Sequence, residues 1–111
     1  MNLLSWISGH FTVRGKALAM YRRALVKIEK NDRAGAIGDY TQVIQHASTP
    51  HDIKGMALYN RALAYAAIGD EENAQADLQT ALALSGVSAK VRQEVQRRIV
   101  RTQHRVGPDD A

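Results

Sequence analysis

The sequence contains no cysteine and only two prolines among its 111 residues. Without cysteine the chain forms neither a disulfide nor a thiolate site. Because proline ends or kinks helices, its scarcity leaves long stretches free to be helical. No apolar run is long enough to cross a membrane as a helix, so we expect no membrane span. These absences exclude a disulfide-stapled scaffold and a cysteine-dependent enzyme.

What is present favours helices. Residues 16–106 are rich in Ala, Leu, Gln, Arg and Glu, all of which are common in helices, and the length suits one domain. The net charge of +4 is unevenly placed. Residues 88–106 hold Lys90, Arg92, Arg97, Arg98, Arg101 and Arg105 against Glu94 alone. The composition predicts an all-α domain with a basic C-terminal part.

The stretch from Leu58 to Leu84 predicts a pair of helices. Leu58, Ala62, Tyr65 and Ile68 recur every three or four residues and form one helical stripe. Gly69 suits the left-handed conformation that ends a helix, and Asp70 is a favourable N-cap for the next one. A turn this short favours antiparallel packing of the two helices.

Similar signals divide the rest of the chain. We expect helices near residues 16–30, 33–46, 50–68, 71–84 and 88–105, and no strand. Asn31 and Asp32 are expected to end the first helix and cap the second. Thr49 is predicted to cap the third helix, with Pro50 at its first helical position. Ser88 is predicted to cap the fifth.

The two hairpins match each other at one constant offset, which we call the repeat step. The matched pairs are Met20 and Leu58, Arg23 and Arg61, Ala24 and Ala62, Asn31 and Gly69, Ala36 and Ala74, and Val43 and Ala81. The pattern resembles the tetratricopeptide repeat family, whose unit is a helix–turn–helix of about 34 residues. The repeat step exceeds that unit by close to one helical turn, which we place around residues 48–55. No Trp opens either unit, and Lys27 stands where the family has tyrosine.

This resemblance covers residues 17–88 and implies an α-α superhelix. Its units span residues 17–48 and 51–85, and residues 88–105 form a solvating capping helix within a domain of residues 16–106. By the same resemblance, the first helix of each unit lines a concave groove. The candidate groove residues are Leu18, Tyr21, Arg22, Leu25, Ile28, Met56, Tyr59, Asn60 and Leu63. Alternatively, this stripe is ordinary core covered by the fifth helix.

Residues 1–15 form a separate apolar arm that includes Trp6 and Phe11. We expect it to dock on the helical body or on a second copy of the chain, with Trp6 buried. A signal peptide is disfavoured because no basic segment precedes the short apolar run. An interfacial anchor is disfavoured because no Lys or Arg precedes Arg14. Residues 107–111 are expected to be a frayed tail.

Catalytic signatures are missing from the sequence. No phosphate loop, nucleophile elbow or paired-carboxylate motif occurs, and His46, His51 and Asp52 match no metal-ligand spacing. We therefore expect no enzyme activity, no cofactor and no metal. The predicted function is a cytoplasmic protein-interaction scaffold that binds a peptide or helix in the groove. The alternative is nucleic-acid binding through Arg97, Arg98, Arg101 and Arg105 of the fifth helix.

Overall fold

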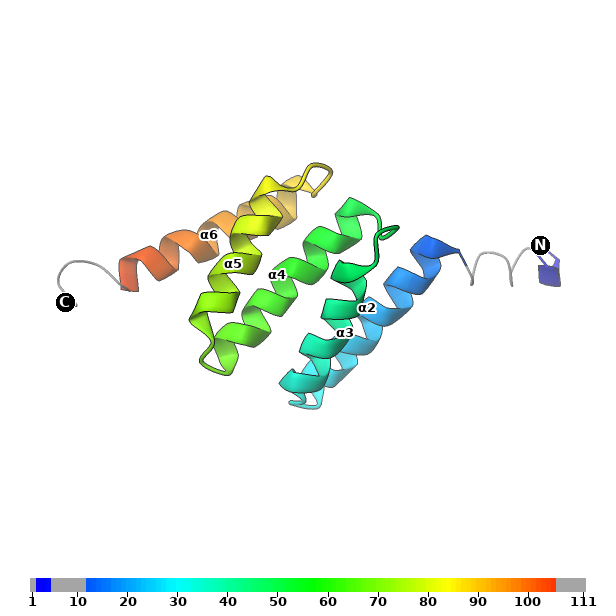
Figure 1. The fold of residues 1–111 in the computed structure, drawn as a ribbon, viewed down its shortest axis with the longest axis horizontal. Helices are drawn as coiled ribbons and strands as arrows, with labels where there is room; N and C mark the ends of the chain where they lie inside the picture. Colours follow the sequence, from blue (N-terminus) through cyan, green and yellow to red (C-terminus); the bar gives the residue numbers. More distant parts are fainter. Residues whose placement is uncertain (1, 5–11, 106–111) are drawn as a thin grey trace.

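Five helices follow one another along residues 13–105 in the computed structural model, which describes residues 2–4 and 12–105 (Figure 1). They are α2 (Val13–Glu29), α3 (Arg33–Gln45), α4 (His51–Ala67), α5 (Glu71–Ala83) and α6 (Ala89–Arg105). The described residues contain no strand. The predicted all-α fold is confirmed, and nine of the ten expected helix ends lie within one residue of those observed.

The helix bounds repeat at the predicted spacing. Helices α2, α4 and α6 begin at residues 13, 51 and 89, and α3 and α5 begin at residues 33 and 71. Each interval equals the repeat step, so α6 has the register of the first helix of a third unit. Helix α2 begins earlier than expected, because the Thr12 side chain caps it by accepting a hydrogen bond from the Gly15 amide at 3.0 Å.

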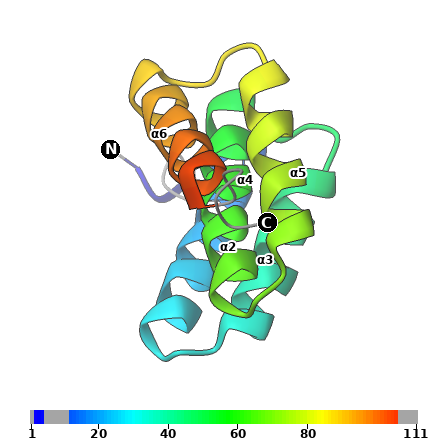
Figure 2. The same cartoon turned by 90° about the vertical axis from the view of Figure 1, so that its left-hand side faces the viewer.

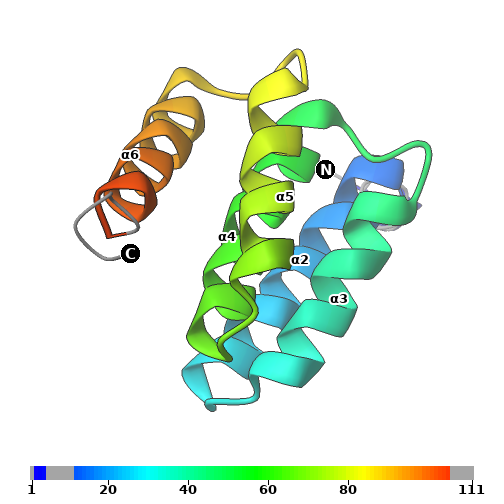
Figure 3. The ribbon, with the colours of Figure 1, turned by 60° about the vertical axis from the view of Figure 1, so that its left-hand side comes forward.

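The helices form two layers. Figures 2 and 3 show α2, α4 and α6 in one layer and α3 and α5 in the other. Helix α4 packs on both α3 and α5, so it joins the first hairpin to the second. The result is an α-α superhelix of two helix–turn–helix units followed by a capping helix.

The two interhelical turns are built alike. Asn31 and Gly69 have φ values of 62° and 86°, in the left-handed region predicted for these helix ends. Asp32 then accepts a hydrogen bond from the Gly35 amide at 2.9 Å, and Asp70 accepts one from the Asn73 amide at 3.2 Å. The predicted aspartate caps are therefore confirmed in both units.

Small residues let the helices of each hairpin approach closely. Ala24 and Ala36 are fully buried in the first hairpin, and Ala62 and Ala74 take the matching places in the second. Larger buried side chains surround these contacts, namely Tyr40, Val43 and Ile53 in the first cluster, and Leu58, Leu78, Val95 and Ile99 in the second. The core therefore consists of two clusters, and the partly buried Ile44 packs against both.

One predicted cap is wrong. Pro50, rather than Thr49, is the N-cap of α4, and it makes no side-chain capping bond. Thr49 is buried and donates its hydroxyl hydrogen bond to the Val43 carbonyl at 2.7 Å. The Thr49 side chain therefore bonds a carbonyl at the end of α3 instead of an amide at the start of α4. The N-cap pattern in the sequence does not distinguish between these two roles.

Helix α6 is the last described helix, and most of its outward side is polar. The side of α2 that faces α3 carries Ala17, Met20 and Ala24. Two repeat steps later, the corresponding positions of α6 hold Gln93, Gln96 and Val100. A further helix packed there would bury two glutamine amides. Arg92 fastens α6 to the end of α5 by donating to the Leu82 and Leu84 carbonyls at 2.8 and 3.2 Å.

The predicted arm and tail lie mostly outside the described residues. Trp6, Phe11 and residues 107–111 belong to that part of the chain. Leu3 and Leu4 are described and are 70% and 76% exposed. Within residues 2–4 and 12–105, no helix is both long and apolar enough to cross a membrane.

Candidate protein-interaction face

All nine predicted groove residues lie on α2 and α4, which occupy the same layer (Figure 2). We call this surface the first-helix face. Most of its side chains are half-buried, namely Leu18, Tyr21, Leu25, Met56, Tyr59, Asn60 and Leu63. Arg22 and Ile28 are exposed. The face is therefore neither ordinary core nor fully solvated surface.

A hydrogen bond joins the two helices at the centre of this face. The Asn60 amide donates to the Tyr21 hydroxyl at 2.9 Å and to the Met56 carbonyl at 2.9 Å. The Tyr21 ring lies 5.9 Å from the Tyr40 ring, centroid to centroid, at a tilt of 52°. Partial burial raises the pKa of the Tyr21 phenol above its usual value. Tyr21 and Asn60 are thus fixed in place by the fold.

Behind the face, each hairpin is braced by an arginine–aspartate pair. Arg23 donates to Asp39 at 3.0 and 2.7 Å, and Arg61 donates to Asp77 at 2.8 and 2.7 Å. The repeat step relates one pair to the other. The two arginines are matched in the sequence, whereas the aspartates were missed because acidic residues in an amphipathic helix normally face solvent.

The two pairs differ in their surroundings. The Asp39 carboxylate also pairs with the Lys27 ammonium group, with an N–O distance of 2.9 Å. The hydrogen bond from Arg23 is the main reason that the pKa of the Asp39 carboxyl lies below its usual value. Arg61 instead donates to the Thr41 hydroxyl at 3.0 Å and lies 5.5 Å above the centre of the Tyr65 ring. Through Thr41, the second pair also ties α4 to α3. These bonds hold the layer that carries the first-helix face.

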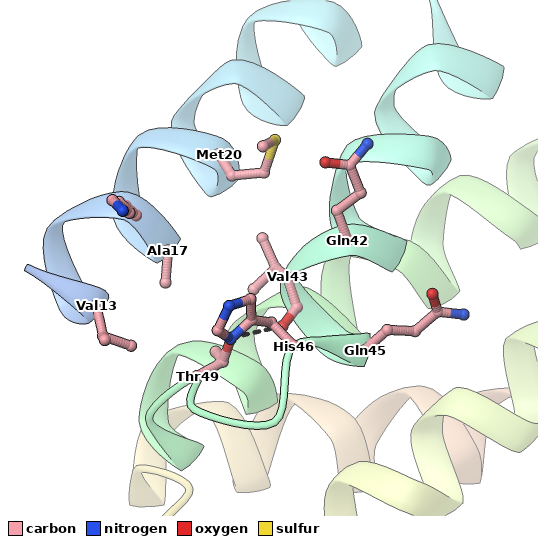
Figure 4. Close-up of a pocket in the computed structure, with 9 residues that line it drawn as sticks. Val13, Ala17, Met20, Gln42, Val43, Gln45, His46 and Thr49 are labelled. Atoms are coloured by element: carbon pink, nitrogen blue, oxygen red, sulfur yellow. Dashed lines mark hydrogen bonds between the residues drawn. The ribbon is translucent and has the colours of Figure 1, made fainter. Parts of the chain in front are cut away.

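A recess of about 550 Å³ lies between the start of α2 and the end of α3 (Figure 4). Its lining residues are Val13, Lys16, Ala17, Met20, Gln42, Val43, Gln45, His46 and Thr49. None of them was predicted as a site residue. The sequence gives little signal for such a recess, because its walls come from two helices and a loop whose approach depends on tertiary packing.

The basic residues predicted as a nucleic-acid site lie on α6. Arg97 donates to Glu94 at 2.9 Å, Arg98 is half-buried and Arg101 is exposed. The Arg105 side chain lies outside the described part of the structure. In the repeat register, Arg97, Arg98 and Arg101 continue the first-helix face onto the third helix of the layer. The two surfaces predicted as alternatives therefore occupy equivalent positions on the helices of one layer.

Comparison with protein-family models, with curated proteins and with solved structures gave no match. Among residues 2–4 and 12–105, no group of three or more His, Asp or Glu side chains is placed to hold a metal ion.

Proposed function

We propose that the chain is a non-catalytic protein-interaction module of the tetratricopeptide type. A segment of a partner protein binds on the first-helix face. The observation that carries this proposal is the row of apolar side chains that the fold leaves half-exposed on α2 and α4, including Leu18, Leu25, Met56 and Leu63. Contiguous apolar surface of this kind marks interaction sites, whereas scattered exposed apolar residues do not.

The periodicity supports the same function. The apolar stripe occurs on both first helices, one repeat step apart, in addition to the stripes that pack α2 on α3 and α4 on α5. A stripe that served only the hairpin interior has no reason to extend around the helix. Repeat proteins use such extended surfaces to bind other proteins.

The experiment is a pull-down with the full chain and two variants. Leu25→Ala with Leu63→Ala truncates the centre of the face, and Ile68→Ala truncates an apolar side chain that is 54% exposed outside it. We expect the wild type and the Ile68→Ala variant to retain the same proteins. The double variant should lose them, because truncating the side chains that anchor an interface removes much of the binding energy. Retention by the double variant, or loss after nuclease treatment, would contradict the proposal.

A further inference from the structure

The recess between the start of α2 and the end of α3 is separate from the first-helix face, because the two surfaces share no residue. Its apolar lining consists of Val13, Ala17, Met20 and Val43. Its volume of about 550 Å³ falls within the range of roughly 300–1,000 Å³ that is typical of small-molecule pockets. The recess is therefore large enough for a small organic ligand.

The second hairpin closes the corresponding space. Val87 stands one repeat step after Thr49 and packs over Gly55, where an added Cβ would lie 2.7 Å from the Val87 Cγ2 atom. Leu58 is 1% exposed there, whereas its counterpart Met20 is only half-buried. The open recess is thus a feature of the first hairpin and not of every unit.

Apolar side chains in the recess remain accessible to solvent. Val13 is 47% exposed, and Met20 is half-buried. In the second hairpin, Ile44 from α3 packs against the cluster that contains Leu58, so protein covers the matching position. A ligand with an apolar chain would remove Val13 and Met20 from water in the same way.

The polar side chains of the recess favour an anionic group. The described lining includes Lys16 and His46 but no Asp or Glu. The Lys16 side chain is exposed, and its ammonium group pairs with no acid among the described residues. The His46 Nδ1 atom accepts a hydrogen bond from the Ser48 amide at 3.2 Å, so the neutral ring carries its hydrogen on Nε2 and can donate it. An ammonium group and an imidazole donor are therefore available together (Figure 4).

We propose that the recess binds a small amphipathic carboxylate, namely an anion with one alkyl chain, such as a medium-chain fatty acid. The alkyl chain covers Val13, Met20 and Val43, and the carboxylate accepts hydrogen bonds from Lys16 and His46. Burial of the chain supplies most of the affinity, and the charge-assisted hydrogen bonds orient the ligand. This site is independent of the first-helix face and goes beyond the proposed function.

The test is an NMR titration of the isotope-labelled full chain with octanoate, below the concentration at which octanoate forms micelles. We expect saturable shift changes at Met20, Val43 and His46, and nuclear Overhauser contacts from the octanoate methylene groups to the Met20 methyl group. The uncharged analogue 1-octanol should bind more weakly. Equal binding of 1-octanol, or no saturable change at the recess, would overturn the inference.

The two donors are tested with a double variant, Lys16→Gln with His46→Leu. Both side chains are exposed, and the second hairpin has Leu84 at the position of His46, so the fold should be retained in circular dichroism. The variant should bind octanoate no better than 1-octanol. Lys16→Gln alone should weaken octanoate roughly 1.5- to 5-fold, the range for one exposed ion pair. The matched control is Lys54→Gln, one repeat step away, which should have no effect; equal losses in both single variants would contradict the assignment of the carboxylate to Lys16.

Other occupants of the recess give different results. An Overhauser contact between Trp6 and the Met20 methyl group in the ligand-free chain would show that the N-terminal arm fills the recess, and would overturn the inference. Octanoate-induced changes confined to Leu25, Tyr59 and Leu63 would also overturn it, while leaving the proposed function in place.

Discussion

Arg61 on α4 and Asp77 on α5 form a two-pronged ion pair inside the second hairpin, with N–O distances of 2.8 and 2.7 Å. Their side chains are 15% and 7% exposed. In the first hairpin, Asp39 has two cationic partners, Arg23 and Lys27. The position that corresponds to Lys27 is Tyr65, so Asp77 has one cationic partner, Arg61, among the described residues.

Replacing Arg61 with Gln should therefore destabilise the fold strongly. The change leaves a buried carboxylate without a charged partner, which typically costs about 3–5 kcal/mol. Urea unfolding followed by circular dichroism measures the loss. Arg23→Gln is the matched control and should cost clearly less, because Lys27 still contacts Asp39 and the Arg23 side chain is 55% exposed. Equal costs would show that Lys27 does not compensate.

Tyr40→Phe should stabilise the protein. The Tyr40 side chain is fully buried, and its hydroxyl has no hydrogen-bond partner among the described residues. Burial also raises the pKa of this phenol to about 12. Removing the hydroxyl should raise the free energy of unfolding by about 1 kcal/mol, the lower range for an unsatisfied buried group. Tyr21→Phe should lower it instead, because Asn60 loses a partner. A destabilised Tyr40→Phe variant would show that the hydroxyl is bonded.

Replacing either of two glycines with alanine should change the free energy of unfolding, in opposite directions. A Cβ on Gly38 meets nothing within 4 Å, and the second unit has Ala76 at this position, so Gly38→Ala should stabilise by roughly 0.8–1 kcal/mol. A Cβ on Gly55 would lie 2.7 Å from the Val87 Cγ2 atom. Because a buried valine has few rotamers, Gly55→Ala should destabilise by roughly 1–3 kcal/mol.

The Gly55 interpretation is checked with a double-mutant cycle in thermal unfolding. Val87→Ala removes the two methyl groups that the new Cβ would meet, so Gly55→Ala should cost less in that background than alone. Strict additivity would indicate that the loss comes from the backbone and not from this contact.

Asp39 should contribute to stability above acidic pH. Its pKa in the folded state is lowered, mainly by hydrogen bonding to Arg23, below the unfolded value of about 3.9. The stabilisation is therefore present above the unfolded pKa and is lost as the pH falls through the folded pKa. Unfolding free energies measured from neutral to acidic pH should decline less steeply for Asp39→Asn than for the wild type.

Asp52 supplies the control for this pH dependence. Arg14 also lowers its pKa, through a surface pair at 2.8 Å in which the Asp52 side chain is 42% exposed. Exposed pairs contribute little to stability. Asp52→Asn should leave the acid dependence almost unchanged, and a large effect would contradict the assignment of that dependence to Asp39.

Local signals predicted most of the fold. The left-handed residues Asn31 and Gly69, the aspartate caps and the repeat step depend on neighbours along the chain, and each is observed. Thr49 was assigned incorrectly because its hydrogen bond to Val43 depends on how the loop returns over α3. The residue before Pro50 has the type of an N-cap, so the sequence predicts that Thr49 caps α4. Tertiary packing decides which backbone group the Thr49 side chain reaches.

The candidate site was only partly predictable. Helical periodicity placed Leu25 and Leu63 on one stripe, because that depends on spacing alone. The bond between Tyr21 and Asn60 joins different helices, and the recess beside Met20 depends on how α2 and α3 approach each other. The continuation of the face onto Arg98 became visible only when the observed helix bounds extended the register to α6.

The most direct test of the central claim, that the first-helix face binds a protein segment, is chemical-shift mapping. The ¹⁵N-labelled full chain is titrated with a peptide taken from a partner protein that the pull-down recovers. We expect the largest changes at Leu25, Tyr59 and Leu63, and little change at Ile68 or in the α2–α3 turn. Changes confined to the recess around Met20 and Val43 would contradict the claim.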